Sequence, residues 1–201
     1  MVVATHNRGK LAEFQRLLGG VPVELVSLDV AGVAAELPEP GTTYEENARA
    51  KAEAARDLTG LPALADDSGI EVFGLGGWPG PSSARWLGDA ADDRDRLLGL
   101  LDEVARRSPG DRRARYVAAV ALARPGAATA VATGECRGVL VEPRGAGGFG
   151  YDPSFLSDDL GVTFGGAPAG AKDGVSHRAR ALRALLASGA LDAISGGQHP
   201  S

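Results

Sequence analysis

The sequence predicts an α/β fold in which a mixed sheet is flanked by helices, and two observations support this prediction. A short apolar run from Met1 to Thr5 indicates a buried first strand, and a polar loop follows it. Beyond the loop, apolar residues recur at helical spacing: Leu11, Phe14, Leu17 and Leu18. Much later, two β-rich segments, Tyr116 to Ala123 and Thr129 to Val141, are joined through Pro125 and Gly126, which favours antiparallel pairing. Alternating strands and helices followed by a hairpin indicate a mixed sheet.

The remaining helices are marked by their ends. Thr43 and Glu46 have the spacing of a capping box and open a helix that stops just before Gly60. Another helix is expected from Asp92 to Arg107, and Ser176 is suited to cap a last one. Along the sequence, the predicted helices therefore alternate with the predicted strands.

The other segments are expected to be extended or irregular. Val23 to Leu28 suits a second strand. Leu64 and Ala65, and then Ile70 to Phe73, are predicted to be extended, so that Asp66 to Gly69 would form a tight connection between them. Leu160 to Gly174 is weakly patterned, and we expect this segment to be mobile.

Composition excludes several classes of protein. With 201 residues and no long linker, the chain fits one domain at residues 1–195 with a frayed tail at residues 196–201. The apolar fraction of 44% is ordinary, and the net charge of -5 argues against a protein that coats DNA or RNA. The single Cys136 excludes an internal disulfide and fits a reducing compartment. Because neither a signal peptide nor an apolar run of bilayer length is found, we expect a cytoplasmic protein without a membrane partner.

The loop after the first strand offers donors to an anion. The hydroxyl of Thr5, the amide of Asn7 and the ammonium of Lys10 can converge on phosphate oxygens at a helix start, where the helix dipole favours negative charge. The alternative is an N-capped surface helix with solvated basic residues, and this segment alone does not separate the two.

Asp66 and Asp67 are the strongest chemical signal. Magnesium is typically held by one or two carboxylates together with phosphates and waters. Of two adjacent carboxylates, one can ligate the metal while the other deprotonates a water. Glu39 could add a metal ligand, and Lys51 lies further along the second helix. A solvated acidic turn is the alternative for the pair, because Asp-Ser-Gly is common turn chemistry.

A third group of residues is suited to a nucleotide base. Phe149 to Asp152 lie in a Gly-rich loop, where an aromatic ring can stack on a base and Asp152 can accept a hydrogen bond from its edge. His177 and Arg178 place two cationic groups at a helix start, against the dipole, which is more often seen where something is bound. The alternative is a Gly-rich turn with Phe149 tucked into the core.

Taken in chain order, these segments resemble the inosine triphosphate pyrophosphatase family, the non-standard purine nucleoside triphosphate pyrophosphatases. The resemblance covers nearly the whole chain. Its markers are Ala4 to Asn7 through Lys10, Glu45 to Ala48 with Lys51, Ala65 to Gly69, Pro79 and Gly80 with Ser83 to Arg85, Gly147 to Pro153, and Ser176 to Arg178. Two departures are that residues Thr163 to Gly170 are rich in Gly, Ala and Pro where the family carries an acidic helical segment, and that Ser82 stands where an aromatic residue is usual.

The resemblance implies hydrolysis of ITP, dITP and XTP to the monophosphate and pyrophosphate, which cleanses the nucleotide pool. It implies magnesium and a homodimer. Manganese is a possible substitute, because the candidate ligands are all oxygen donors. The expected partner is a small nucleoside triphosphate and not a nucleic-acid polymer. The implied fold is an elongated, strongly twisted mixed sheet flanked by helices, with two lobes and a nucleotide cleft between them.

The resemblance also implies a role for each site residue. Asp67 would be the general base, and the metal would lie near Glu39, Asp66 and Asp67. The triphosphate would be held by Thr5, Asn7, Lys10, Lys51 and Ser68. The base would meet the loop and three cationic residues: Phe149, Gly150, Tyr151, Asp152, Lys172, His177 and Arg178. We expect Arg178 or His177 to donate a hydrogen bond to the 6-oxo group of hypoxanthine or xanthine. Adenine carries an amino group at that position, which is itself a donor and leaves these side chains unpaired.

Three other activities remain open from the residues alone. The chain could be a pyrophosphatase for modified or pyrimidine triphosphates, although His177 and Arg178 disfavour this. It could be a catalytically silent nucleotide-binding protein, which Asp66, Asp67 and Lys10 argue against. It could also release single phosphates, in which case inosine diphosphate would appear instead of the monophosphate.

Overall fold

The computed structural model describes residues 1–88 and 90–191, so the predicted tail lies outside the described residues. The chain forms two compact units, and each is assembled from separate stretches of sequence. Among the described residues, unit 1 contains Met1–Asp67, Ala118–Gly134 and residues 178–191, and unit 2 contains Ser68–Val117 and Glu135–His177. Three of the boundaries fall inside strands and the fourth falls at the start of a helix, rather than in linkers. The expectation of a single domain stays a prediction.

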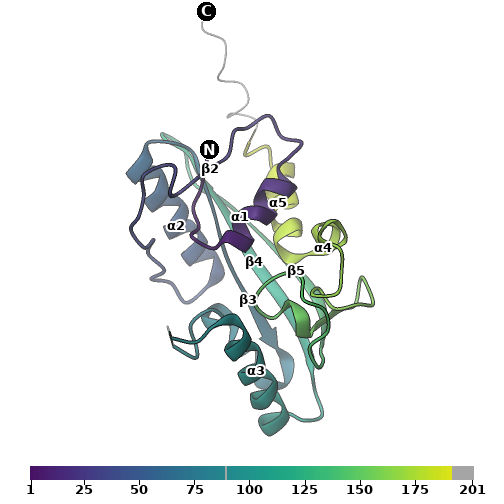
Figure 1. Cartoon of the computed structure of the whole chain (residues 1–201). Coiled ribbons are helices and arrows are strands. Elements are labelled where there is room, and N and C mark those ends of the chain that lie inside the picture. Colours follow the sequence, from purple (N-terminus) through teal and green to yellow (C-terminus); the bar gives the residue numbers. More distant parts are fainter. Residues whose placement is uncertain (89, 192–201) are drawn as a thin grey trace, which may run out of the picture. The chain divides into compact units, whose positions relative to one another are not determined.

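The strands form one six-stranded sheet in the order β2-β1-β3-β4-β5-β6. The strands are β1 (Val2–Val3), β2 (Val26–Ser27), β3 (Ala63–Val72), β4 (Arg113–Ala123), β5 (Ala130–Leu140) and β6 (Phe155–Ser157). Strand β1 pairs in parallel with β2 and β3, while β5 and β6 are antiparallel. The connection of β4 to β5 at residues 124–129 is too short for a parallel crossover, as the predicted hairpin requires. The prediction of a mixed α/β sheet is therefore confirmed (Figure 1).

Five α-helices accompany the sheet in the described residues. They are α1 (Arg8–Leu17), α2 (Tyr44–Thr59), α3 (Asp93–Arg107), α4 (Ala169–Val175) and α5 (His177–Ala187). Thr43 and Glu46 make the predicted capping box, and Gly60 ends α2 with a φ of 69°, a left-handed value that glycine adopts without strain. Short 3-10 turns occur at Phe73–Leu75, Gly80–Ser82 and Asp152–Ser154.

One prediction about local structure was wrong. The acidic stretch is not a turn, because β3 runs without interruption from Ala63 to Val72 and includes Asp66 and Asp67. Strand pairing and burial have overridden the turn propensity of these residues. The end of the segment from Leu160 to Gly174 belongs to α4 (Ala169–Val175), where Lys172 is buried, and the expected mobility of the segment stays a prediction.

Each unit has its own apolar core. In unit 1, Val3, Phe14, Leu64, Val120 and Leu182 pack together, so that α1 and α5 lie side by side (Figure 1). The core of unit 2 is richer in aromatic residues and includes Ile70, Leu100, Tyr116, Phe155 and Phe164. Buried apolar area supplies most of the stabilisation, and it also surrounds the charged groups described next with a low-dielectric environment.

Candidate active site

The alternation of side chains along β3 sends two adjacent carboxylates in opposite directions. Asp66 shares its face with Leu64, which packs in the core formed with α1 and α5. Asp67 lies on the other face and meets side chains of α2. Both are almost fully buried, with relative exposures of 2% and 5%. Buried carboxylates require partners, and three helices of unit 1 supply them.

Asp66 is held by two cations. Arg178 donates from Nε and from a terminal nitrogen to Asp66 Oδ2 at 3.0 and 2.9 Å, and Lys10 Nζ lies 3.1 Å from the same oxygen. Arg178 also donates to Glu13, which is buried on α1. Burial alone would raise the pKa of Asp66, but Arg178, Lys10 and Lys51 outweigh it and hold this pKa far below its usual range. Asp66 is therefore a fixed negative charge.

Asp67 has a different environment. Asn47 Nδ2 donates to Asp67 Oδ2 at 3.0 Å, and Lys51 Nζ lies 3.3 Å from Oδ1. Lys51 also donates to Glu39 Oε1 at 2.5 Å, so it is shared between two carboxylates. Burial raises the pKa of Asp67, and the opposing effects of Lys51, Lys10 and Asn47 do not cancel the rise. A carboxylate with a raised pKa is a better proton acceptor than an ordinary one.

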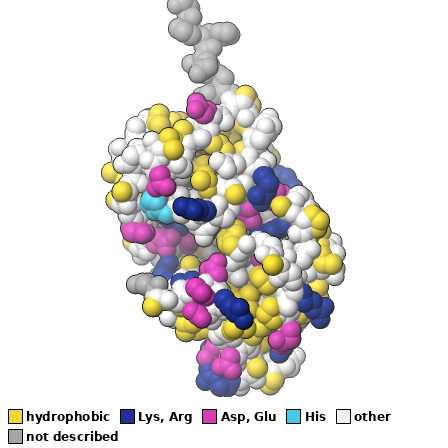
Figure 2. All heavy atoms as spheres, in the orientation of Figure 1, with side chains coloured by type: hydrophobic (Ala, Val, Ile, Leu, Met, Phe, Trp, Pro, Cys, Tyr) yellow, Lys and Arg dark blue, Asp and Glu magenta, His cyan; other side chains and the backbone are white. Residues whose placement is uncertain are grey.

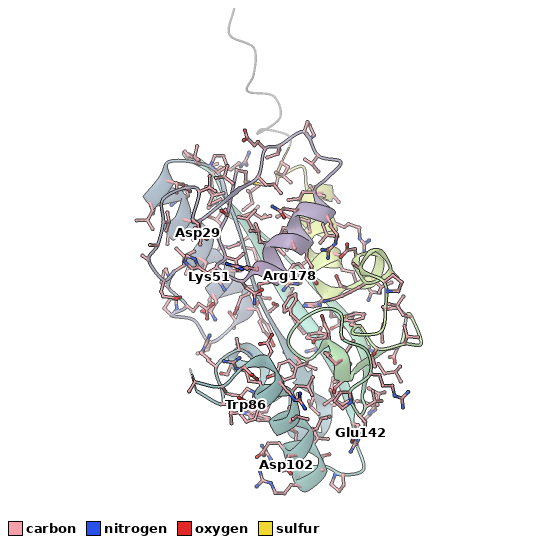
Figure 3. All side chains as sticks on the ribbon, in the orientation of Figure 1. Asp29, Lys51, Trp86, Asp102, Glu142 and Arg178 are labelled. Carbon is pink, nitrogen blue, oxygen red and sulfur yellow. The ribbon has the colours of Figure 1, made fainter. Side chains whose placement is uncertain are left out.

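The two lysines respond differently to the same carboxylates. Burial lowers the pKa of Lys10, despite attraction from Asp66. For Lys51, burial acts in the same direction but is outweighed by Asp67, Asp66 and Glu39, so its pKa is raised. Figure 3 labels Lys51 on α2 and Arg178 on α5, two of the three helices that bring cations to β3.

Thr5 and Asn7 build the start of α1. The backbone N–H of Asn7 donates to Thr5 Oγ1 at 3.1 Å, and that of Lys10 donates to Asn7 Oδ1 at 3.0 Å. The capped helix considered in the sequence is therefore present, and it directs Lys10 toward Asp66. On the exposed side of this loop, the ring of His6 lies 3.7 Å from Asp29, and Figure 2 shows acidic side chains gathered around a histidine on this face.

No ready-made metal cage is present among residues 1–88 and 90–191, because no group of three or more His, Cys, Asp or Glu side chains is placed to hold a metal ion. The predicted set Glu39, Asp66 and Asp67 is divided among lysine and arginine partners instead. Magnesium requires only one or two carboxylates when phosphates and waters complete its octahedron, so this donor set fits a metal that arrives with the substrate.

A second group of predicted residues meets in unit 2 around Asp152. This carboxylate is 1% exposed and accepts hydrogen bonds from Lys172 Nζ at 2.5 Å, from Tyr116 Oη at 3.2 Å and from the backbone of Phe149 at 3.0 Å. Gly148 has a φ of 72°, and a Cβ there would lie 2.1 Å from Asp152 Oδ2. The loop can therefore close over Asp152 only with glycine at this position.

Aromatic rings surround the cation of this group. Lys172 Nζ lies 4.9 Å from the ring centroid of Phe149, which is partly exposed, and 5.4 Å from that of Phe164. The imidazole of His177 stacks on the ring of Tyr116 with centroids 4.6 Å apart and an angle of 8° between the planes. His177 Nδ1 is also 4.0 Å from Cys136 Sγ.

Three predicted base contacts are placed differently from expectation. Arg178 belongs to unit 1 and is engaged by Asp66 and Glu13, because its helix starts beside the buried carboxylates. Tyr151 is a core residue whose hydroxyl donates to the Ser83 carbonyl at 2.7 Å and accepts from Trp86 at 2.8 Å. The backbone N–H of Gly150 donates to Asp93 at 2.8 Å, so it fastens the loop to the start of α3.

Ser68, a predicted phosphate contact, follows Asp67 on β3 and is partly exposed.

Sequence reasoning missed three residues that complete these groups. Glu13 lies one turn from Lys10 and Leu17 on the buried stripe of α1, and an acidic residue within an apolar stripe predicts a buried cationic partner. Asn47 follows the capping box of α2 and is fully buried, which its polar side chain did not suggest. Tyr116 was assigned only to a strand, and nothing in its local sequence indicates that it meets Asp152 and His177.

Comparison with known proteins places this chain in a family. A sequence profile of the Ham1 family matches residues 1–188. The chain belongs to the Ham1 family. It is 46% identical over 186 residues to the dITP/XTP pyrophosphatase of Geobacter sulfurreducens, which covers 92% of this chain and 94% of that protein. It is 49% identical over 187 residues to the protein of the same name from Symbiobacterium thermophilum, with 92% of each chain covered.

Solved structures of the Ham1 family have the same fold. A HAM1 protein from Coxiella burnetii aligns with a TM-score of 0.83 and 36% identity, covering 93% of this chain and 96% of that one. The Ham1 protein of Staphylococcus aureus aligns with a TM-score of 0.80 and 34% identity, covering 92% and 95%. As for membranes, every helix in the described residues is too short or too polar to cross one.

Proposed function

We propose that this protein hydrolyses dITP, XTP and ITP to the corresponding monophosphate and pyrophosphate. The observation that carries the proposal is the pair of adjacent, buried carboxylates whose environments push their pKa values in opposite directions. Such a separation assigns different roles to two otherwise equal groups. Curated relatives that are 46% and 49% identical carry the name dITP/XTP pyrophosphatase, which supports the substrate class.

In this proposal Asp67 is the general base. It takes a proton from the water that attacks the α-phosphorus, the bond from that phosphorus to the bridging oxygen breaks, and pyrophosphate leaves. Asn47 fixes the orientation of Asp67 through its amide. Lys10 and Lys51 stabilise the negative charge that moves onto the leaving group. Thr5, Asn7 and Ser68 are proposed to complete the phosphate contacts. Positioning and electrostatics supply most of the rate in such a reaction.

Magnesium is the proposed cofactor, with manganese as a substitute. Asp66 and Asp67 would hold it, with Glu39 as a further oxygen donor, and all three are hard ligands of the kind that magnesium prefers. When bound, the ion neutralises phosphate charge and polarises the bond to be broken. Arg178 is proposed to act through Asp66 and not on the metal itself, because it holds Asp66 ionised and in one orientation.

The base is proposed to meet the unit 2 group. Phe149 offers a partly exposed ring, and Lys172 and His177 offer donors that suit the 6-oxo group of hypoxanthine or xanthine. Adenine carries an amino group at that position, so these donors would be left unpaired. Asp152 holds Lys172 in place from the opposite side.

The test is incubation of the purified protein with dITP and magnesium, followed by identification of the products. We expect deoxyinosine monophosphate and pyrophosphate, and loss of turnover after EDTA treatment that added magnesium restores. Deoxyinosine diphosphate would indicate a phosphatase instead, and a preference for pyrimidine triphosphates in a substrate panel would indicate the related activity. Binding of dITP without products would leave a silent nucleotide-binding protein.

Two further parts of the proposal concern the state of the protein in the cell. We propose a homodimer, supported by the family resemblance, and a cytoplasmic location, supported by a sequence whose single Cys136 cannot form an internal disulfide. Sedimentation of the purified protein distinguishes a dimer from a monomer, and fractionation of cells that express the chain tests its location.

A further inference from the structure

Tyr116 occupies an unusual position in unit 2, because it contacts two predicted base-reading segments at once. Its hydroxyl donates to Asp152 Oδ1 at 3.2 Å, while its ring stacks on the imidazole of His177 at a centroid distance of 4.6 Å. Asp152 follows the Gly-rich loop, and His177 begins α5. These two segments are 25 residues apart in the chain, and β4 contributes the residue that joins them.

The surroundings of Tyr116 hold it in one orientation. It is 7% exposed, and its ring contacts Phe155 at 4.6 Å and Phe164 at 6.0 Å between centroids. Burial, together with the nearby charge of Asp152, raises the pKa of Tyr116 well above its ordinary value of 10.0. The phenol therefore stays protonated at any physiological pH and remains a donor to Asp152.

The hydroxyl and the ring of Tyr116 hold two different residues in place. Asp152 also accepts from Lys172, so the Tyr116 hydroxyl fixes the carboxylate that in turn fixes the Lys172 ammonium. The Tyr116 ring lies parallel to the imidazole of His177, at an angle of 8°, and limits the rotation of that ring. A donor that is held in one position discriminates between a 6-oxo and a 6-amino group, whereas a donor that can turn away does not.

We propose that Tyr116 is a positioning residue for substrate selection, which sets Lys172 through Asp152 and sets His177 by stacking. This inference rests on the proposed function, and it assigns to Tyr116 an effect on the choice of base rather than on the chemical step. Asp67 belongs to unit 1, whereas the hydrogen bond and the ring contacts of Tyr116 are made within unit 2.

Two variants separate the two contacts. Tyr116→Phe keeps the stacked ring and removes the hydroxyl, and Tyr116→Leu removes both. We expect the ratio of kcat/KM for dITP over dATP to fall about threefold to tenfold in Tyr116→Phe, and further in Tyr116→Leu. This is less than a hydrogen bond to a charged group contributes directly, because the hydroxyl acts on Lys172 through Asp152. The change should appear mainly as a higher KM for dITP, with kcat for dITP changed much less.

Tyr44→Phe is the matched control, because it removes a buried phenol hydroxyl from unit 1. The ratio should be unchanged in this variant. Thermal unfolding of all three variants shows whether the folded state is retained, and Tyr116→Phe serves as the measurement if Tyr116→Leu does not fold.

The outcomes separate this inference from the proposed function. If the wild-type protein does not turn over dITP, the proposed function fails. If it does, but Tyr116→Phe and Tyr116→Leu slow dITP and dATP by the same factor, Tyr116 supports the fold alone and the inference is overturned. The inference is supported if the ratio of kcat/KM for dITP over dATP is lower in Tyr116→Phe than in the wild type, and lower again in Tyr116→Leu.

Discussion

The two groups of site residues differ in how they hold a buried carboxylate. In unit 1, Asp66 and Asp67 are held by the long, flexible cations Lys10 and Lys51 and by Arg178, and few aromatic rings are involved. In unit 2, a single carboxylate, Asp152, is held by one lysine, one phenol and one backbone N–H inside an aromatic shell.

In the proposed function, this difference corresponds to two kinds of recognition. A cluster dominated by charge acts on phosphate and metal, and it does not distinguish one base from another. A cluster of fixed donors and flat rings carries directional information and suits a base edge. Variants in the first group should therefore change rate for all substrates alike, and variants in the second should change the ratio between substrates.

The largest effect is expected for Asp67→Asn. The amide has the same shape, and its oxygen can still accept a hydrogen bond from either Asn47 or Lys51, but it cannot take a proton from water. We expect kcat to fall about a hundredfold or more, while nucleotide binding is largely retained. Single-turnover rates and equilibrium binding of dITP measure the two quantities separately. Near wild-type turnover would remove Asp67 from the role of base.

Arg178→Ala should reduce the rate by about tenfold or more, because the charged hydrogen bonds that fix Asp66 are lost. Since Arg178 is placed with Asp66 and Glu13, dITP and dATP should be affected equally, contrary to the expectation from sequence that it reads the base. Steady-state kinetics with both nucleotides check this. A fall in the dITP/dATP ratio would return Arg178 to the base-reading group.

The stability of the same variant needs its own control. Removal of Arg178 leaves Asp66 and Glu13 buried with less compensation, which typically costs about 3–5 kcal/mol. The double variant Arg178→Met with Glu13→Gln removes one of these buried charges together with the arginine. It should recover part of the free energy of unfolding, measured by denaturant titration, without recovering the rate.

Lys172→Met tests the opposite side of the comparison. Methionine has a similar length and no charge, and Asp152 keeps its hydrogen bonds from Tyr116 and Phe149. We expect the ratio of kcat/KM for dITP over dATP to fall about tenfold, the value of one charged hydrogen bond. Equal losses for both nucleotides would show that the base edge is read elsewhere.

The smallest effect concerns stability and pH. Burial raises the pKa of Asp67 above its ordinary value of 3.8, so the folded state binds more protons than the unfolded state between that value and the raised one. Asp67 therefore destabilises the fold progressively as the pH rises through this window. Asp67→Asn removes the effect. The free energy of unfolding of this variant relative to wild type should therefore increase with pH from about 4 upward, in total by about 1.4 kcal/mol for each pH unit by which folding raises the pKa of Asp67. Metal-free denaturant titrations at several pH values measure it, and a constant difference would contradict the assignment.

The parts of the fold that follow from local sequence were predictable. The capping box at Thr43 and Glu46 and the left-handed Gly60 fix α2 through contacts within a few residues. By contrast, Asp66 to Gly69 were predicted to form a turn, but they lie within the continuous strand β3, which is flanked by β1 and β4 in the sheet. The local preference of these residues is opposed by strand pairing and by cations from distant helices that hold the two carboxylates. The contact between Arg178 and Asp66 joins residues 112 apart in the chain, and such separations are invisible to local patterns.

The site was predictable as a list of residues more than as an arrangement. Lys10, Lys51, Asp66 and Asp67 do come together, as the motifs indicated. Tyr151 illustrates what local sequence does not reveal. An aromatic residue in a Gly-rich loop suits either stacking on a ligand or packing, and its partners Trp86 and Ser83 lie more than 60 residues earlier in the chain.

The alignment of β3 with β1 has a consequence for how the chain can change. Val2 lies opposite Ala63 and Val3 opposite Leu64, and this pairing decides which face each later side chain occupies. A slip of one residue would put either Ala65 or Ser68 where a carboxylate is needed, because the chain has no third acidic residue next to the pair. One residue inserted or deleted just before the strand could thus abolish catalysis while leaving every catalytic side chain in the sequence. The register of β3 thus determines where the two carboxylates lie.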